Sequence, residues 1–236
     1  MCTLTWWRGK NGSFEVFFNR DEKKSRPPAE GPVIREEGEV RFLAPRDPAG
    51  GGTWMLANDR GVVLCLLNRW HEESGEDRAW RSRGLLVWGL AGLPEAAALG
   101  DLLRPAELVD TRPFSLWAFD ATGVAGWDWD GEALSPVEKV MPVTSSSFRF
   151  EEVAAARREA FAGVNPDGPA DLARFHAGIE PASASTVRMC RPDAQTMSRS
   201  EVRVTSAEVT WRYLAEQADL AGPPEENCSR LLRHSS

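Results

Sequence analysis

Residues 1–22 read MCTLTWWRGKNGSFEVFFNRDE, and the fold expected for the chain depends on the pattern in this stretch. Two runs rich in Thr, Trp, Phe and Val, at 3–8 and 13–19, flank a segment at 9–12 that contains two glycines. Such runs fit a pleated, half-buried surface, and glycine suits the turn between two strands. The stretch therefore predicts a β-hairpin.

The register of this hairpin decides which side chains accompany Cys2. A two-residue loop at the Asn-Gly pair suits a type I′ turn, because both central residues take positive φ, and it places Cys2 opposite Asp21. A loop centred one residue earlier places Cys2 opposite Asn19. Either register puts these three side chains on one face of the sheet, whereas a three-residue loop would place Cys2 against Arg20.

Cys2 directly follows the initiator Met1 and is small enough for that methionine to be removed. Removal would leave a cysteine with both a thiol and a free α-amino group, which is a nucleophile with its own base. On the expected face, Asp21 would orient the amine and the Asn19 amide would donate to an oxyanion. The alternative is a small second residue that arose by chance and the polar end of an ordinary strand.

Further short motifs follow along the chain. They are the NRDE run at 19–22, Ser25-Arg26-Pro27, Gly51-Gly52-Thr53-Trp54, Asn68 after an apolar strand and Arg83-Gly84. Together with the Met-Cys start they resemble the transport and Golgi organisation 2 family, also called NRDE proteins, most strongly over residues 1–90. That family resembles N-terminal nucleophile hydrolases of the penicillin V acylase, bile-salt hydrolase and acid ceramidase group, which cleave non-peptide amides with an N-terminal cysteine.

The resemblance implies roles for further residues. Asn68 falls where bile-salt hydrolases carry an oxyanion asparagine, although a turn-forming Asn is an equal interpretation without the family. Arg199, in a Ser-Arg-Ser segment that resembles the family's Thr-Arg-Thr, is a candidate for substrate binding or for lowering the thiol pKa, but it also fits a strand-surface arginine. Arg20 and Trp54 are further substrate-binding candidates.

Two departures from the relatives stand out. Bile-salt hydrolases have an arginine immediately before the Asn of this motif, where this chain has Phe18. A serine run at 144–147 occupies the place of a second oxyanion asparagine, and hydroxyl groups would substitute for it only weakly.

Composition excludes several classes of function. The chain has 236 residues and 42% hydrophobic content. Its formal net charge of −7 argues against a surface that binds nucleic acid without regard to sequence. No segment approaches the ~20 apolar residues of a membrane span, and the start lacks a secretory signal, so we expect a cytoplasmic protein. The four cysteines are far apart in the sequence, and we expect them to be free thiols. The three histidines are scattered, so we expect no metal site, and we expect no other cofactor.

Periodicity and turn residues predict the remaining elements. We expect a mainly irregular segment at 22–52 with short extended pieces, and a frayed tail over 222–236. The expected strands are 53–57, 62–67, 116–121, 124–130, 140–143, 186–189, 196–204 and 209–214, and the expected helices are 83–91, 94–99, 106–109, 151–162 and 169–177.

The sequence thus predicts an α+β protein, a four-layer α/β/β/α sandwich forming a single domain over 1–236, as the resemblance implies. The expected function is hydrolysis or acyl transfer of a small-molecule acyl-amide by Cys2 after removal of Met1. The alternative is a protein of the same fold that binds or carries a lipid-like or other small ligand without turnover.

Overall fold

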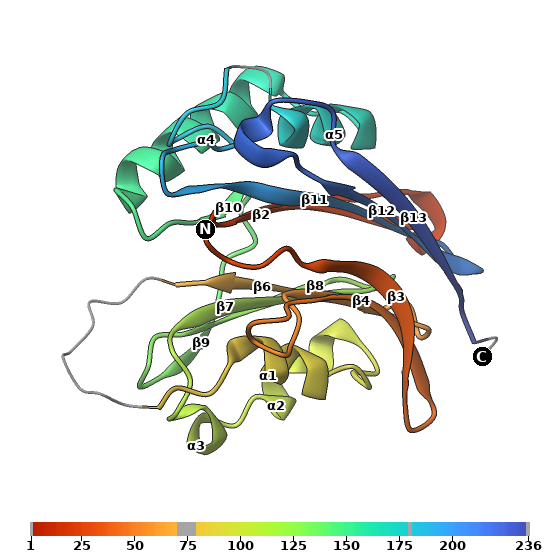
Figure 1. The fold of residues 1–236 in the computed structure, drawn as a ribbon. Helices are drawn as coiled ribbons and strands as arrows, with labels where there is room; N and C mark the ends of the chain where they lie inside the picture. Colours follow the sequence, from red (N-terminus) through yellow and green to blue (C-terminus); the bar gives the residue numbers. More distant parts are fainter. Residues whose placement is uncertain (1, 70–78, 179–180, 235–236) are drawn as a thin grey trace.

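A computed structural model describes residues 2–69, 79–178 and 181–234 of the chain. Two β-sheets face each other, and helices cover the outer surface of each sheet (Figure 1). The predicted four-layer α/β/β/α arrangement is confirmed. The first strand of the chain lies within the upper sheet, and the last strand forms an edge of the same sheet.

The upper sheet in Figure 1 contains both strands of the N-terminal hairpin. Within the described residues its order is β10-β1-β2-β11-β12-β13, all antiparallel neighbours. Their bounds are β10 (Val143–Ser145), β1 (Cys2–Arg8), β2 (Phe14–Lys23), β11 (Ala194–Val204), β12 (Glu208–Ala215) and β13 (Glu225–Leu232). The hairpin therefore lies inside the sheet and not at its edge.

The lower sheet is an antiparallel meander. Its order, β3-β4-β5-β6-β7-β8-β9, follows the chain without a crossover. The bounds are β3 (Glu30–Glu37), β4 (Val40–Arg46), β5 (Met55–Asn58), β6 (Val63–Asn68), β7 (Phe114–Phe119), β8 (Val124–Trp129) and β9 (Leu134–Pro136). Because β6 pairs on both sides and is covered on both faces, it is apolar until Asn68, as predicted.

Short helices cover the lower sheet, and two longer helices cover the upper one (Figure 1). Below the sheets are α1 (Arg83–Gly89), α2 (Leu99–Leu102) and α3 (Pro105–Leu108), and above them are α4 (Phe150–Val164) and α5 (Pro169–Ala177). Single 3-10 turns are η1 (Lys10–Gly12), η2 (Ala96–Ala98) and η3 (Ala218–Leu220). The predicted helices at 83–91, 151–162 and 169–177 are confirmed within a few residues.

The predicted register of the first hairpin is wrong. Cys2 pairs with Arg20, not with Asp21 or Asn19. The turn uses three residues, Lys10–Gly12, and is closed by a hydrogen bond from Gly9 N–H to the Ser13 carbonyl at 2.8 Å. Asn11 and Gly12 do take positive φ, as expected, but the turn also includes Lys10, so the pairing shifts by one residue.

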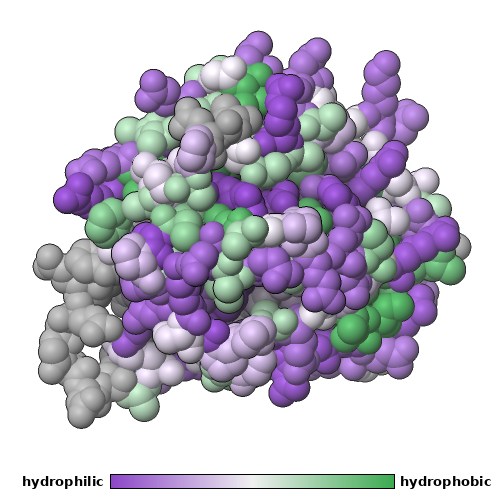
Figure 2. Space-filling model, turned by 45° about the horizontal axis from the view of Figure 1, so that its top comes forward, coloured by the Kyte–Doolittle hydropathy of each residue, from purple (hydrophilic) through white to green (hydrophobic). Residues whose placement is uncertain are grey.

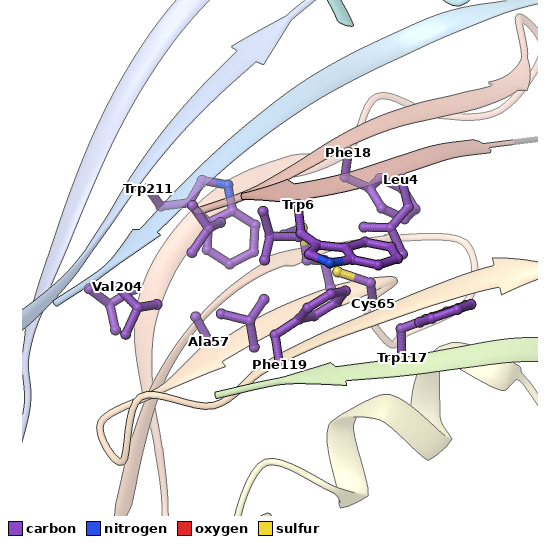
Figure 3. Packing of buried hydrophobic residues seen from close by; sticks show 14 of the residues in the cluster. Leu4, Trp6, Phe18, Ala57, Cys65, Trp117, Phe119, Val204 and Trp211 are labelled. Carbon is purple, nitrogen blue, oxygen red and sulfur yellow. The ribbon is translucent and has the colours of Figure 1, made fainter. Parts of the chain in front are cut away.

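The main apolar core fills the space between the sheets. Figure 3 shows Trp6 of the upper sheet packed against Trp117 and Phe119 of the lower sheet. The ring centroids of Trp6 lie 5.5 Å from those of both partners, in the tilted geometry that aromatic pairs prefer. A second core, around Leu64 and Leu116, packs the lower sheet against its helices.

Four segments differ from the sequence prediction. The region 22–52, expected to be mainly irregular, contains the β3–β4 hairpin, and the strand expected at 140–143 begins at 143 and includes part of the serine run. Residues 186–189 form no strand of their own. The expected tail over 222–236 contains β13, which pairs with β12 and buries Leu231 at 1% exposure.

The face in Figure 2 is mainly hydrophilic, and hydrophobic side chains occur there in separate patches. Over the described residues, no helix combines the length and hydropathy required to cross a bilayer.

Candidate active site

A cavity of about 290 Å³ opens beside the thiol of Cys2. Residues from both layers line it: Cys2 and Arg20 from the upper sheet, Asn68 from the lower sheet, Trp54 from the segment just before β5, and Arg83 from α1. The cavity lining thus includes five of the residues predicted for the site, Cys2, Arg20, Asp21, Trp54 and Asn68, and it adds Arg83, for which the sequence had suggested no role.

Cys2 belongs to a row of side chains that crosses four neighbouring strands. The ladder partners are Ser145 with Cys2, Cys2 with Arg20, and Arg20 with Ser198. Because directly paired residues of an antiparallel sheet project to the same side, all four point between the sheets. Cys2 is 6% exposed, and the Ser145 hydroxyl is buried with no hydrogen-bond partner among the described residues.

The Cys2 thiol is held in its neutral form. Burial raises its pKa above the ordinary value, and the negative charge of Asp21 raises it further. The guanidinium of Arg20 and a hydrogen bond from the Asp21 backbone N–H lower the pKa without reversing the effect of burial. A neutral thiol needs a base to remove its proton before it can attack a carbonyl.

Arg20 is fixed against both an aromatic ring and a carboxylate. Its guanidinium carbon lies 4.3 Å from the ring centroid of Trp54, and one guanidinium nitrogen lies 3.6 Å from the Glu22 carboxylate. A planar guanidinium stacks well on an indole ring while its edge stays available for hydrogen bonds. Trp54, predicted as a substrate-binding residue, thus supports Arg20 in the cavity wall.

Asp21 projects to the other side of the sheet, toward α4. One carboxylate oxygen accepts a hydrogen bond from Arg157 at 2.9 Å, and the other accepts one from the Thr196 hydroxyl at 2.7 Å. The side chains of Asp21 and Arg157 are both completely buried. The carboxylate is therefore a fixed charge directly behind the strand end that carries Cys2.

Arg157 connects this carboxylate to the nucleophile's own backbone. The same guanidinium donates to the Cys2 carbonyl at 3.3 Å and to the Thr3 hydroxyl at 2.7 Å. The sequence prediction assigned Arg157 no role, yet a signal was present. Val153, Arg157 and Phe161 recur every four residues in α4, so the apolar periodicity of the helix already placed an arginine on its inner face.

Asn19 lies on the same side as Asp21 and outside the cavity lining. Its amide nitrogen donates to the carbonyls of His176 and Val187, both at 3.0 Å. Its oxygen therefore faces Nδ1 of His176 at 2.7 Å as an acceptor, so the ring donates from Nδ1 and accepts the Thr5 hydroxyl at Nε2, 2.9 Å away. The expected oxyanion role of Asn19 has no geometric support, because both amide hydrogens are already used.

The imidazole of His176 is neutral because it is buried. Complete burial lowers its pKa to about 3, and the nearby positive charges of Arg199 and Arg157 act in the same direction. The ring stacks on Phe17 at 5.9 Å between centroids. His176 therefore joins α5 to the hairpin and takes no part in the cavity.

Asn68 and Arg199 have different positions relative to the cavity. Asn68 is the last residue of β6, is exposed, and belongs to the cavity lining. Arg199 pairs with Asn19 in the ladder and thus faces the helices, where its Nε donates to the buried carboxylate of Glu216 at 2.6 Å. The expectation that Arg199 approaches the thiol is not met.

Comparisons with known proteins agree with this architecture. A family model described as "Transport and Golgi organisation 2" matches residues 1–133. No curated protein matches the chain.

Two solved structures of the conjugated bile acid hydrolase from Clostridium perfringens are similar in fold. A cysteine-to-alanine mutant has a TM-score of 0.53 and 11% identity, covering 100% of this chain and 97% of that one. An arginine-to-leucine variant has a TM-score of 0.55 and 13% identity, covering 96% and 92%. At these identities the similarity establishes the N-terminal nucleophile hydrolase fold and no particular reaction.

Proposed function

The chain belongs to the transport and Golgi organisation 2 family, and on this premise we propose that it hydrolyses a non-peptide amide, or transfers its acyl group, with Cys2 as the nucleophile. One observation carries the proposal. Arg157 binds both the Cys2 carbonyl and the Asp21 carboxylate, so the thiol, the strand end and a fixed negative charge are held together at a cavity.

The opposite orientations of the Cys2 and Asp21 side chains are compatible with this chemistry. The α-amino group is part of the backbone, and side-chain alternation does not restrict it to one face. After removal of Met1, the amine would lie at the strand end between the thiol on one side and the Asp21 carboxylate on the other. Asp21 would orient the amine by accepting its hydrogen bond.

In the acylation step, the α-amine of Cys2 takes the thiol proton as the sulfur forms a bond to the amide carbon. The carbonyl π pair moves to oxygen, and the Asn68 amide donates a hydrogen bond to that oxyanion. When the tetrahedral intermediate collapses, the C–N bond breaks and the leaving nitrogen takes the proton back from the ammonium. A thioester remains on Cys2.

Water, or another acceptor, then attacks the thioester, with the α-amine again removing a proton. The C–S bond breaks, the sulfur recovers a proton, and the acyl group leaves as an acid or as a new acyl product. Arg20, next to Cys2 in the ladder, stabilises the thiolate character that develops on sulfur. These steps use only groups of the chain itself and the acyl acceptor.

Intact-mass measurement followed by a substrate assay tests the proposal. The purified protein should lack Met1, and a panel of N-acyl amides should yield turnover that Cys2→Ala abolishes. Cys228→Ala, which removes an exposed thiol on β13, is the matched control and should retain full activity. Retention of Met1 in active protein, or equal turnover by Cys2→Ala and the parent, would refute the mechanism.

The neutral, buried state of the Cys2 thiol favours a second candidate function, a binder of small acyl ligands without turnover. In that case N-acyl amides would bind to the parent and to Cys2→Ala with equal affinity. An electrophile such as iodoacetamide would label Cys2 slowly, and no acyl-enzyme would be seen by mass.

A further inference from the structure

Among the described residues that line the cavity beside Cys2, arginines outnumber carboxylates. Within the described part of the chain, its lining includes five arginines and three carboxylates. Each carboxylate is already engaged by a guanidinium: Asp21 by Arg157, Asp47 by Arg26, and Glu22 by Arg20. Among the described residues, the lining carboxylates thus already have guanidinium partners, and none of them forms an ion pair with Arg83.

Arg83 is the clearest of these cations. It is the first residue of α1, and its guanidinium donates to the Pro113 carbonyl at 2.8 Å, which fixes its orientation. Over residues 2–69, 79–178 and 181–234, no carboxylate lies within ion-pair distance of Arg83. Burial, followed by the like charge of Arg112, lowers its pKa to about 10, so the site holds positive charge at an electrostatic cost.

Two glycines bring Arg83 to the cavity. A Cβ atom on Gly52 would lie 2.2 Å from the carbonyl carbon of Gly84, and the Thr53 N–H donates to the Gly84 carbonyl at 3.1 Å. Only residues without a side chain allow this contact between the 51–54 segment and the first turn of α1. The next residue, Trp54, supports Arg20 from the same segment.

We infer that this cavity takes an amide that also carries an oxyanion, either a carboxylate or a phosphate group, and that Arg83 binds that group while the amide carbonyl faces Cys2. The inference rests on the proposed function and specifies its substrate class. The Gly-Gly-Thr-Trp motif is the scaffold of this anion subsite, because it contacts α1, which carries Arg83, and supports Arg20 of the upper sheet.

The chemistry of the side chains agrees with this assignment. A guanidinium presents a rigid fork of N–H donors that matches the paired oxygens of a carboxylate or phosphate, and hydrogen bonds between such charged groups are strong. A cavity of about 290 Å³ suits one small polar group and the amide beside it. Binding of the anion at a fixed point would align the carbonyl with the thiol.

Binding measurements on Cys2→Ala test the charge preference without turnover. The probes are N-octanoylglycine, its neutral counterpart N-octanoylglycinamide, and N-octanoyl-phosphoethanolamine. We expect at least one anionic probe to bind about tenfold or more tightly than the neutral amide, as a charge-assisted hydrogen bond allows. The more tightly bound of the two identifies carboxylate or phosphate. Equal affinity of all three, or no binding of either anionic probe, would overturn the inference.

Arg83→Gln in the same background should remove the preference, and Arg83→Lys should restore part of it. Arg104→Gln is the matched control, because Arg104 is an exposed arginine of the same layer that is absent from the cavity lining. Unfolding curves establish that each variant folds. If Arg83→Gln does not fold, the comparison of charged and neutral probes on Cys2→Ala alone still shows whether the cavity prefers an anion. A preference that persists in folded Arg83→Gln contradicts the assignment.

Turnover by the parent separates this inference from the proposed function. A charge preference in binding without hydrolysis of any probe would refute the hydrolase and keep the anion subsite. Hydrolysis at equal kcat/KM for the charged and neutral amides would refute the subsite and keep the hydrolase.

Discussion

Arg20 lies directly opposite Cys2 in the β1–β2 ladder, and its guanidinium stacks on Trp54 from the facing sheet. This relationship joins the two sheets at the nucleophile. It also places Arg20, together with Glu22, on the thiol's side of the sheet, while Asp21 lies on the other side and is bound by Arg157.

Replacement of Arg20 by Met should raise the pKa of the Cys2 thiol, because the positive charge favours the thiolate. The pH profile of Cys2 alkylation by iodoacetamide should therefore shift to higher pH, and the rate at neutral pH should fall. Arg20→Lys should shift the profile less. Arg203→Met, at an exposed arginine of β11, is the control, and an unshifted profile in Arg20→Met would exclude electrostatic coupling to the thiol.

Arg157→Met should destabilise the protein by about 3–5 kcal/mol, because it leaves the buried Asp21 carboxylate without its cation. The adjacent Arg158 is exposed on the same helix, so Arg158→Met controls for the loss of one arginine from α4 and should change stability by less than about 0.5 kcal/mol. Urea unfolding measures both. Similar free energies of unfolding for the two variants would show that the buried pair is not needed for stability.

Acidification should destabilise the fold through His176 before most carboxylates titrate. The unfolded imidazole binds a proton below pH 6.5, whereas the folded one stays neutral down to about 3, so the unfolded state takes up more protons in this window. Stability should thus fall as the pH falls, by about 2 kcal/mol between pH 6.5 and about 4.5.

Urea midpoints at several pH values measure this effect. His176→Gln should be less stable than the parent at neutral pH but should lose less stability on acidification. His234→Gln, at an exposed histidine, should keep the slope of the parent. Identical slopes for the parent and His176→Gln would rule out His176 as the source.

Gly52→Ala should destabilise the protein and displace Arg83, because the added methyl group would meet the Gly84 backbone at 2.2 Å. Gly89→Ala in α1 has no neighbour within 4 Å and should be neutral or slightly stabilising, since alanine favours a helix. Thermal unfolding compares the two. Equal stability of Gly52→Ala and the parent would mean that the segment can move aside without cost.

The architecture could be predicted from the sequence because alternation, turn residues and apolar periodicity agreed along most of the chain. β13 was missed because it is an edge strand with mostly exposed side chains, and its burial of Leu231 is a tertiary effect. The β3–β4 hairpin was missed for a similar reason, since its outer residues are charged or exposed and resemble a loop in the sequence.

The structure brings several of the predicted site residues together, but in a different geometry from the predicted one. Five of the predicted residues line one cavity: Cys2, Arg20, Asp21, Trp54 and Asn68. Asn19 was assigned to the same face as Cys2 because a two-residue turn is the favoured choice for an Asn-Gly pair, and one additional turn residue reversed the assignment.

Arg199 was misplaced because pairing between β11 and β2 cannot be derived from either strand alone. A register irregularity between Thr196 and Ser198 sets which residues of β11 face the helices, and the sequence does not reveal such a bulge. The partner of Arg199, Glu216, lies beyond the end of β12 and was likewise hidden from local patterns.

The three-residue turn at Lys10–Gly12 makes the length of a surface loop a functional constraint. Insertion or deletion of one residue there would exchange the two faces of β1 relative to β2, moving Leu4 and Trp6 toward the helices and Thr3 and Thr5 into the apolar core. We therefore expect the turn to tolerate changes of residue identity but no change of length. The turn is at the far end of the hairpin from Cys2, yet its length determines which side chains lie beside the thiol.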